Sequence, residues 1–386
     1  MTRVRAGALL ATVGAALVVL VASGVARIDR APALTAGSPP AVLAADTDTD
    51  TTAAVDVTPG VPPTTPATTA GARGLLGSGQ PVTIAFAGDT HFEAHLRTRL
   101  ANEGAAMFDT MQPLFAGADL SVLNLETAIT ERGSAQPKEW TFRAPPAALD
   151  ALAAAGIDAV SMANNHGLDY GGDDALGDSL AARAAAPLAV LGIGTDAGDA
   201  YRPMLTEVRG QRIAVVAATQ VLDDTLIGRW TASDARPGLA SAKTVSRLTA
   251  TVRALRYFAD TVVVFLHWGQ ERTACPTTNQ RDLAPQLLEA GADIVVGSHA
   301  HRLLGAGRMG DGFVAYGLGN FVWFNESGPN GDTGVLVVTA TGRRIDGYEW
   351  RPARIRNGVP APLEGQALSD AAARWNGLRA CTGLSP

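Results

Sequence analysis

The chain has 386 residues, of which 47% are hydrophobic, and its formal net charge is −6. That hydrophobic share is ordinary for a folded protein, and a stretch of about 300 residues can bury a sizeable single core. The acidic balance argues against a general nucleic-acid binder, which normally carries a basic patch, and we expect no nucleic-acid partner.

The N-terminus has the features of an export signal. Arg3 and Arg5 precede the apolar run AGALLATVGAALVVLVASGVA, whose length of about 21 residues would span roughly 31 Å as a helix. The positive flank predicts a cytoplasmic N-terminus and export of everything that follows. We therefore assign residues 1–27 to a signal anchor or, if the chain is cut after the small residues Gly24 to Ala26, to a signal peptide. The expected location is the cell membrane, single-pass with an extracytoplasmic domain, or secreted if the signal is cleaved.

A linker and one folded domain are predicted to follow. Residues 28–80 are rich in Thr, Pro, Ala and Asp and lack large apolar side chains, which predicts a disordered, extended spacer. Residues 81–386 form the expected domain. It contains both cysteines, Cys275 and Cys381. An exported protein permits a disulfide between them, and two unpaired thiols are the alternative.

Apolar strands and helical stretches alternate along this domain. Short β-branched runs predict strands at 82–87, 120–125, 158–163, 188–193, 212–218, 261–268, 293–298, 313–319 and 334–340. Charges at helical spacing predict helices at 144–155, 173–184, 244–258 and 279–290. The alternation predicts an α/β fold with a largely central sheet. Segments 313–356, which have no helix between them, predict an antiparallel addition to the central sheet or, as the alternative, to a second sheet.

The positions of the histidines give the most specific functional signal. Five of the six, His91, His166, His267, His299 and His301, lie just past or at the end of a predicted strand, each near Asp, Asn or Glu. In open α/β folds, ligands bind outside the carboxyl ends of the strands. Ordinary turn residues explain any one such cluster, but they explain all of them together poorly. The sixth, His95, is expected on the surface or behind the ligands.

Together these clusters offer imidazole nitrogens, carboxylates and amide oxygens. Such donors suit borderline divalent ions such as Mn, Zn or Fe. The ligands are too many for one tetrahedral metal, and two ions bridged by a carboxylate fit better. A metal pair of this kind clamps a phosphoryl group and activates water.

Six ordered motifs, GDTHF, NLE, ANNHGLDYG, HWGQE, GSHAH and GLGNF, resemble the CapA family of capsule and poly-γ-glutamate synthesis proteins. That family is similar to the calcineurin-like metallophosphoesterases. The resemblance covers roughly residues 82 to 325. It implies a four-layer α/β/β/α sandwich and an extracytoplasmic location. It also implies a role with capsular or poly-γ-glutamyl polymer, with other capsule-synthesis proteins as candidate partners.

The metallophosphoesterase pattern also implies roles for individual residues. Asp89, His91 and His301 would hold one metal, and Asn165, His267 and His299 the other. Glu126 would bridge the two ions, and His166 would act on the transition state or leaving group. The chain departs from the superfamily at two positions: Glu126 stands where an Asp is usual, and Ser298 separates Gly297 from His299.

Further residues have two interpretations each. Arg143 is either an anion-binding group or a solvated loop charge. Asn320 either orients a ligand or is a turn residue. Glu271 either orients His267 or contacts the substrate, and having neither role is the alternative. Asn124 shares a strand face with Glu126. Trp268 and Trp323 are expected in the core, with pocket lining as the alternative.

Two functional hypotheses follow from the sequence. The first, which we favour, is a metal-dependent, phosphoesterase-like hydrolase with two divalent ions that acts on an exported, phosphate-containing substrate or an anionic polymer. The alternative is a non-catalytic polymer-binding or export accessory protein for an anionic cell-surface polymer.

Overall fold

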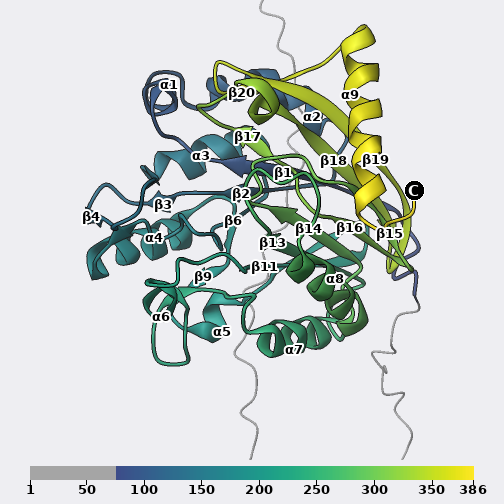
Figure 1. Cartoon of the computed structure of the whole chain (residues 1–386). Coiled ribbons are helices and arrows are strands. Elements are labelled where there is room, and N and C mark those ends of the chain that lie inside the picture. The colour runs from purple at the N-terminus through teal and green to yellow at the C-terminus, as the bar shows by residue number, and fades with distance from the viewer. Residues whose placement is uncertain (1–74) are drawn as a thin grey trace, which may run out of the picture. The chain divides into compact units, whose positions relative to one another are not determined.

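The described part of the chain consists of two β-sheets with helices on their outer faces (Figure 1). It was analysed as a computed structural model, which describes residues 75–386. The alternation of strand and helix predicted from the sequence is confirmed, and so is the α/β class.

The larger sheet has eight strands in the order β20-β19-β18-β1-β2-β6-β8, with β17 also paired to β1. Strands β1, β2, β6 and β8 are parallel, whereas β18 pairs antiparallel with β1, β19 with β18, and β20 with β19. The expected antiparallel addition is therefore present in this sheet. The bounds are β1 Val82–Thr90, β2 Leu120–Leu125, β6 Ala159–Ser161, β8 Ala189–Leu191, β17 Asn320–Val322, β18 Asp332–Thr341, β19 Arg344–Arg356 and β20 Val359–Pro362.

The smaller sheet has six strands in the order β10-β11-β13-β14-β16-β15. Its four inner strands are parallel. The predicted strand 313–319 therefore joins this sheet rather than the antiparallel addition. The bounds are β10 Met204–Val208, β11 Gln211–Thr219, β13 Thr261–His267, β14 Ile294–Ser298, β15 Ala306–Met309 and β16 Gly312–Ala315.

Nine α-helices and three short two-stranded pairings complete the part of the chain from 75 to 386. The helices are α1 His95–Glu103, α2 Gln112–Phe115, α3 Ala147–Ala154, α4 Asp173–Ala185, α5 Ala197–Ala200, α6 Ile227–Trp230, α7 Val245–Leu255, α8 Thr278–Ala290 and α9 Gly365–Gly377. The small pairings join β3 Ala128–Ile129 to β5 Arg143–Ala144, β4 Ser134–Ala135 to β7 Tyr170–Gly171, and β9 Ile193–Gly194 to β12 Gly238–Leu239. Each of the four predicted helices is present, as α3, α4, α7 and α8.

Three apolar clusters give the domain its layers. One lies between the sheets, where Phe86 of β1 meets Phe265 of β13 with ring centroids 6.5 Å apart. A second packs the larger sheet against α1 and α3, and a third packs the smaller sheet against α7 and α8. Strands buried on both faces need continuous apolar runs, which is why TVVVFLH is fully buried as β13. The fold is therefore a four-layer α/β/β/α sandwich.

The N-terminal predictions lie largely outside the described residues. The predicted anchor or signal, residues 1–27, and the linker up to residue 74 are not described. Residues 75–80, which the sequence assigns to the linker, instead form a turn held by Gln211. Its amide donates to the carbonyls of Leu76 and Gln80 at 2.9 and 2.8 Å. Between residues 75 and 386, no helix is both long and apolar enough to span a bilayer.

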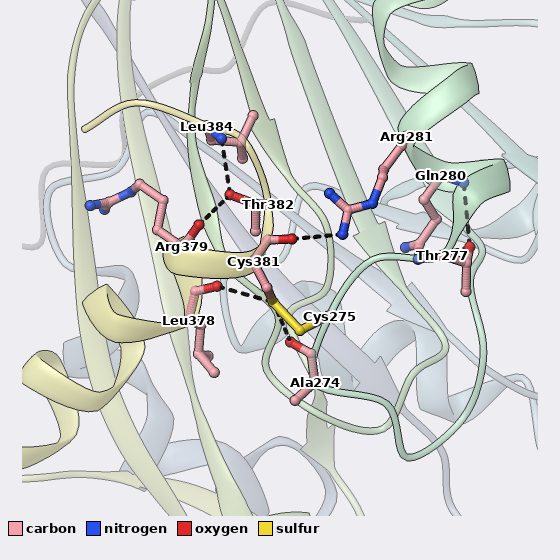
Figure 2. Close-up of a disulfide and its surroundings, with 10 residues drawn as sticks. All are labelled: Ala274, Cys275, Thr277, Gln280, Arg281, Leu378, Arg379, Cys381, Thr382 and Leu384. Atoms are coloured by element: carbon pink, nitrogen blue, oxygen red, sulfur yellow. Dashed lines mark hydrogen bonds between the residues drawn. A yellow bond between two sulfur atoms is a disulfide. The ribbon is translucent and has the colours of Figure 1, made fainter.

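The two cysteines form a disulfide, so the predicted pairing is confirmed. Cys275 lies in the loop between β13 and α8, and Cys381 lies near the C-terminus, with Cα atoms 5.8 Å apart (Figure 2). Arg281 of α8 donates to the Cys381 carbonyl at 2.7 Å, which ties the same segments together a second time. The bridge thus fixes the C-terminal segment to the loop that follows His267.

Candidate metal centre

The predicted ligands gather where parallel strands of both sheets end. Asp89 is near the end of β1, and its Cα register pairs it with Asn124 of β2 on one side and Asn320 of β17 on the other. His267 ends β13, and His299 directly follows β14. The residues share this edge because parallel strands run in the same direction, so their carboxyl ends lie side by side.

Asp89 is fixed by a close approach of two backbone segments. The carbonyl of Gly319 accepts the Asp89 N–H at 2.9 Å. A Cβ on Gly88 would lie 1.9 Å from that carbonyl oxygen, so only glycine fits before Asp89. The Asp89 carboxylate then accepts the Asn124 amide at 2.8 Å and the His299 N–H at 3.1 Å. These bonds aim a fully buried carboxylate at the cluster.

Glu126 has the most unusual environment in the site. Its side chain is fully buried, yet among the described residues neither carboxylate oxygen has a hydrogen-bond partner. Burial first, and then the negative charge of Asp89, raise the pKa of Glu126 well above its ordinary value. Buried polar groups are nearly always paired, so two unpartnered oxygens at one position make Glu126 a candidate cation ligand.

His267 faces this carboxylate from the opposite sheet. Its Nε2 lies 2.7 Å from Asn165 Oδ1 and 3.5 Å from Glu126 Oε1. Its Nδ1 lies 3.0 Å from Ser298 Oγ and 3.2 Å from the Asn124 amide. The Nδ1 atom is thus held by polar neighbours, while Nε2 points at the oxygens of Asn165 and Glu126, which suit a divalent ion.

His299 and His301 are held by unusual backbone conformations. Both have positive φ values, 94° and 51°, which non-glycine residues rarely adopt and which cluster at functional sites. The Nδ1 of His301 lies 2.8 Å from Asn320 Oδ1 and 3.3 Å from Asp89 Oδ2. The Nδ1 of His299 is buried and has no hydrogen-bond partner among residues 75–386. The strained loop therefore turns two imidazoles toward the carboxylates.

Two ligand groups emerge, and Glu126 belongs to both. Ligand atoms of Glu126, His299 and His301 lie within 4.8 Å of one another, and so do those of Asp89, Glu126 and His267. Burial lowers the pKa of His267 well below its ordinary value and that of His299 to about 3. These imidazoles are therefore neutral at physiological pH and present lone pairs, which is the form that binds metals.

The grouping differs from the one that the resemblance implies. Glu126 stands between the groups, as a bridging residue would. Asp89, however, falls in the group of His267, whereas His299 falls in that of His301. His91 belongs to neither group. The N–H of Glu93 donates to its Nδ1 at 3.1 Å, and that of Phe324 faces its Nε2 at 3.5 Å.

His91 therefore forms part of the wall of the site. Its ring stacks on Phe142 and meets Trp323 edge-on, with centroids 4.6 and 4.2 Å away. β1 continues through Thr90, and His91 directly follows it among these rings, so the expectation that Asp89 and His91 reach one cation stays a prediction. His95, by contrast, is exposed at the start of α1, as expected for a surface residue.

His166 belongs to a polar chain that includes residues the sequence interpretation left unassigned. Its Nε2 lies 3.8 Å from Glu126 Oε1, and its Nδ1 makes a short contact with Asp169 Oδ2. Lys138 donates to Asp169 Oδ1 at 2.6 Å and also to the carbonyl of Asn165. Burial raises the pKa of Asp169 to about 7, although Lys138 opposes this shift.

Asp169 could have been found in the motif ANNHGLDYG, because it follows His166 by three residues in a turn. Lys138 carries no such local signal. The segment around it reaches the site through the short β4–β7 pairing and through bonds from Gln136 N–H to the Asp169 carbonyl at 2.8 Å and from Phe142 N–H to Asp169 Oδ2 at 2.7 Å.

The remaining predicted residues separate into those at the centre and those outside it. Asn124 and Asn320 each bond directly to a member of a ligand group. Glu271 is exposed, but its charge contributes to the raised pKa of Glu126. Arg143 lies elsewhere: its guanidinium sits over the Tyr170 ring, 4.5 Å from the centroid. Trp268 is in the core, and its indole donates to the Tyr316 carbonyl at 2.9 Å.

The same region of the chain matches a known protein family. Residues 83–325 match the family described as bacterial capsule synthesis protein PGA_cap. The chain belongs to this family. The cluster around Glu126 lies within the matched residues, whereas β18, β19, β20 and α9 follow them.

Relatives of this capsule synthesis protein include named bacterial proteins. It is 28% identical over 295 residues to "PGA biosynthesis protein CapA" of Bacillus subtilis (strain 168), an alignment that covers 74% of this chain and 75% of the relative. It is 31% identical over 190 residues to a "probable polyglutamine synthesis accessory protein" of Mycobacterium tuberculosis, over 47% and 50% of the two chains. A solved structure titled as a putative 5'-nucleotidase from Staphylococcus aureus aligns with a TM-score of 0.42 and 14% identity, over 77% of this chain and 58% of that one.

Proposed function

We propose that this capsule synthesis family member is a metal-dependent hydrolase of the phosphoesterase type, built around two divalent ions. The observation that carries the proposal is Glu126, a fully buried carboxylate that both ligand groups share and whose oxygens have no other partner in the described chain. Mn, Zn or Fe would suit the mixed nitrogen and oxygen donors.

The fit to a metal pair rests on the chemistry of the donor set. Asp89, Glu126, His267, His299 and His301 would hold the ions, with Asn165 beside His267 as an amide oxygen ligand. Two bound ions would polarise a phosphoryl group and lower the pKa of an attacking water. Because the imidazoles are neutral and only Asp89 and Glu126 carry negative charge, two divalent ions would leave the loaded site with a net positive charge, which favours binding of an anionic ester.

In this proposal His166 moves a proton during the reaction. Its Nε2 faces the cluster, while its Nδ1 faces Asp169. A phosphoryl group beside Nε2 would favour the protonated imidazole, and the Nε2 proton could then pass to the departing oxygen. Asp169 would hold the ring in that orientation, and Lys138 would hold Asp169.

The setting of the reaction follows from the N-terminal sequence. In this proposal residues 1–27 anchor the chain, or direct its secretion if they are cleaved, and the domain acts outside the cytoplasmic membrane. The Cys275–Cys381 disulfide supports an oxidising compartment. The name of the Bacillus subtilis relative supports a substrate from the synthesis of an anionic surface polymer such as poly-γ-glutamate. Other capsule-synthesis proteins would then be partners.

A second candidate function is polymer binding or export without catalysis. It is favoured by the printed name of the Mycobacterium tuberculosis relative, which calls that protein a synthesis accessory protein. In this case the candidate metal centre would hold an anionic chain, and the metal ions would serve as counter-charges.

One set of measurements separates the two functions. The purified full chain would be assayed for metal content, for turnover of a generic phosphomonoester and phosphodiester before and after chelation, and for binding of poly-γ-glutamate. His166→Ala removes the proposed proton donor, and His95→Ala is the matched control on the exposed start of α1. Chelator-sensitive turnover that His166→Ala abolishes and His95→Ala preserves supports the hydrolase. Polymer binding without turnover supports the second function, and a folded, metal-free chain without a chelator effect refutes the first.

A further inference from the structure

A row of aromatic rings leads from the candidate metal centre to the protein surface. It begins at His301, whose ring centroid lies 4.5 Å from that of Trp323. Trp323 is nearly parallel to Phe324, with 6.0 Å between centroids, and Phe324 lies 6.3 Å from Trp140. Exposure rises along this row, from 7% for Trp323 to 56% for Trp140. The row therefore joins a ligand group to solvent.

The inner rings of this region pack against the imidazoles. Phe142 stacks on both His166 and His91, with centroids 4.1 and 4.6 Å away. Trp323 contacts His91 and His301. Packing the walls of the site accounts for these two side chains.

Phe324 also meets His91 edge-on, with centroids 5.0 Å apart, whereas Trp140 has no contact with the imidazoles among the ring contacts of the described residues. The ring contact of Trp140 is with Phe324, and more than half of the indole is in water. Single exposed apolar side chains are common, but adjoining ones beside a polar centre often mark a binding site. Trp140 and Phe324, which we call the outer platform, come from segments 140–142 and 320–324, far apart in the sequence, yet they meet beside one site.

The opening of the centre faces the same side. Asp89, Glu126 and His267 are fully buried, whereas the side chains of His301 and His166 are 14% and 7% exposed. The rings that border these two imidazoles are Trp323 and Phe142. A phosphoryl group that enters between His166 and His301 would therefore carry its organic group out along the ring row.

We propose that the outer platform stacks against a ring carried by the substrate on the group joined to phosphorus. This inference rests on the proposed phosphoesterase function and narrows its substrate class to esters of a sugar or an aromatic group. Both kinds of ring present a flat face that packs on an indole, and such stacking strengthens binding by roughly tenfold. A poly-γ-glutamate chain has no ring to place there.

Binding of non-hydrolysable probes tests this inference without turnover. Calorimetry on the full-length, Mn²⁺-loaded protein would compare phenylphosphonate, which carries a ring on phosphorus, with methylphosphonate, which does not. The methylene-phosphonate isosteres of glucose 1-phosphate and glycerol 3-phosphate, in which a C–P bond replaces the ester bond, would be compared in the same way. The variants are Trp140→Ala and the ring-retaining Trp140→Phe. The control is Tyr257→Ala, which removes an 82% exposed aromatic ring just after α7.

We expect wild type to bind at least one ring-bearing probe about tenfold more tightly than its ring-free partner. Trp140→Ala should abolish that ratio and leave the ring-free probes unchanged, while Trp140→Phe and Tyr257→Ala should keep it. A ratio seen only with phenylphosphonate would assign an aromatic group, and one seen only with the isostere of glucose 1-phosphate would assign a sugar. An equal ratio in wild type and Trp140→Ala would overturn the inference alone. Failure of the ring-free probes to bind metal-loaded wild type would instead count against the proposed function.

Discussion

Replacing Glu126 with Gln should have opposite consequences for the metal-free and the metal-loaded protein. In the metal-free protein, burial and the negative charge of Asp89 raise the pKa of Glu126, which favours its neutral acid form. Glutamine is also neutral and nearly the same size. We therefore expect the free energy of unfolding of the metal-free protein to change by less than about 1 kcal/mol, or a melting temperature shift of about 2 °C or less.

The metal-loaded protein should respond quite differently. A ligand that binds only the folded state, at one hundred times its dissociation constant, adds about 2.7 kcal/mol of stability. That corresponds to about 5 °C for a domain of this size. Glu126→Gln removes the carboxylate that both ligand groups share, so most of this gain should disappear.

Scanning calorimetry after chelation, with and without added Mn²⁺, measures both effects. Glu289→Gln, at an exposed position of α8, is the matched control and should behave as wild type. A Glu126→Gln variant that keeps the full Mn²⁺ shift would refute the bridging role. A metal-free variant that melts many degrees lower would show that Glu126 is a structural acid instead.

Three further predictions concern protons, catalysis and the disulfide. Metal binding near pH 7 should release about one proton, because Glu126 must ionise while the imidazoles are already neutral, and metal affinity should therefore rise with pH. Calorimetry in two buffers of different ionisation enthalpy measures the number of protons released, and proton uptake would contradict the prediction. Asp169→Asn should lower kcat by about a hundredfold or more, because His166 loses its orientation, and should leave the metal content unchanged. Loss of metal from this variant would instead assign Asp169 a structural role. Replacing both Cys275 and Cys381 by Ser should lower the free energy of unfolding by about 2–4 kcal/mol, since the bridge closes a loop of 106 residues; an unchanged denaturation midpoint would show that the bridge contributes nothing.

The fold was predictable because its signal is local. Runs such as TVVVFLH can only be buried strands, and the alternation with helices leaves few ways to arrange them. The gathering of His267, His299 and Asp89 also follows, because parallel strands bring their carboxyl ends to one edge. The C-terminal helix α9 was not predicted. Its sequence, GQALSDAAARWNG, has few large apolar residues, and it is anchored chiefly by Trp375 against Trp350, with centroids 5.0 Å apart.

The finer geometry of the site depends on contacts between distant segments. The Asp-x-His spacing gave no sign that Phe142 and Trp323 would hold the imidazole of His91. Lys138 reaches Asp169 across a loop, and Trp140 meets Phe324 from a segment far along the chain. Side chains that meet through tertiary packing leave no periodic pattern in either segment, so only the folded structure brings them together.

Anomalous diffraction from crystals of the Mn²⁺-loaded protein tests the central claim most directly. Data collected near the manganese edge would locate the ions relative to Glu126. We expect two peaks flanking the Glu126 carboxylate, one beside Asp89 and His267 and the other beside His299 and His301. A well-ordered crystal with no peak at Glu126, or with a single ion that Glu126 does not contact, would contradict it.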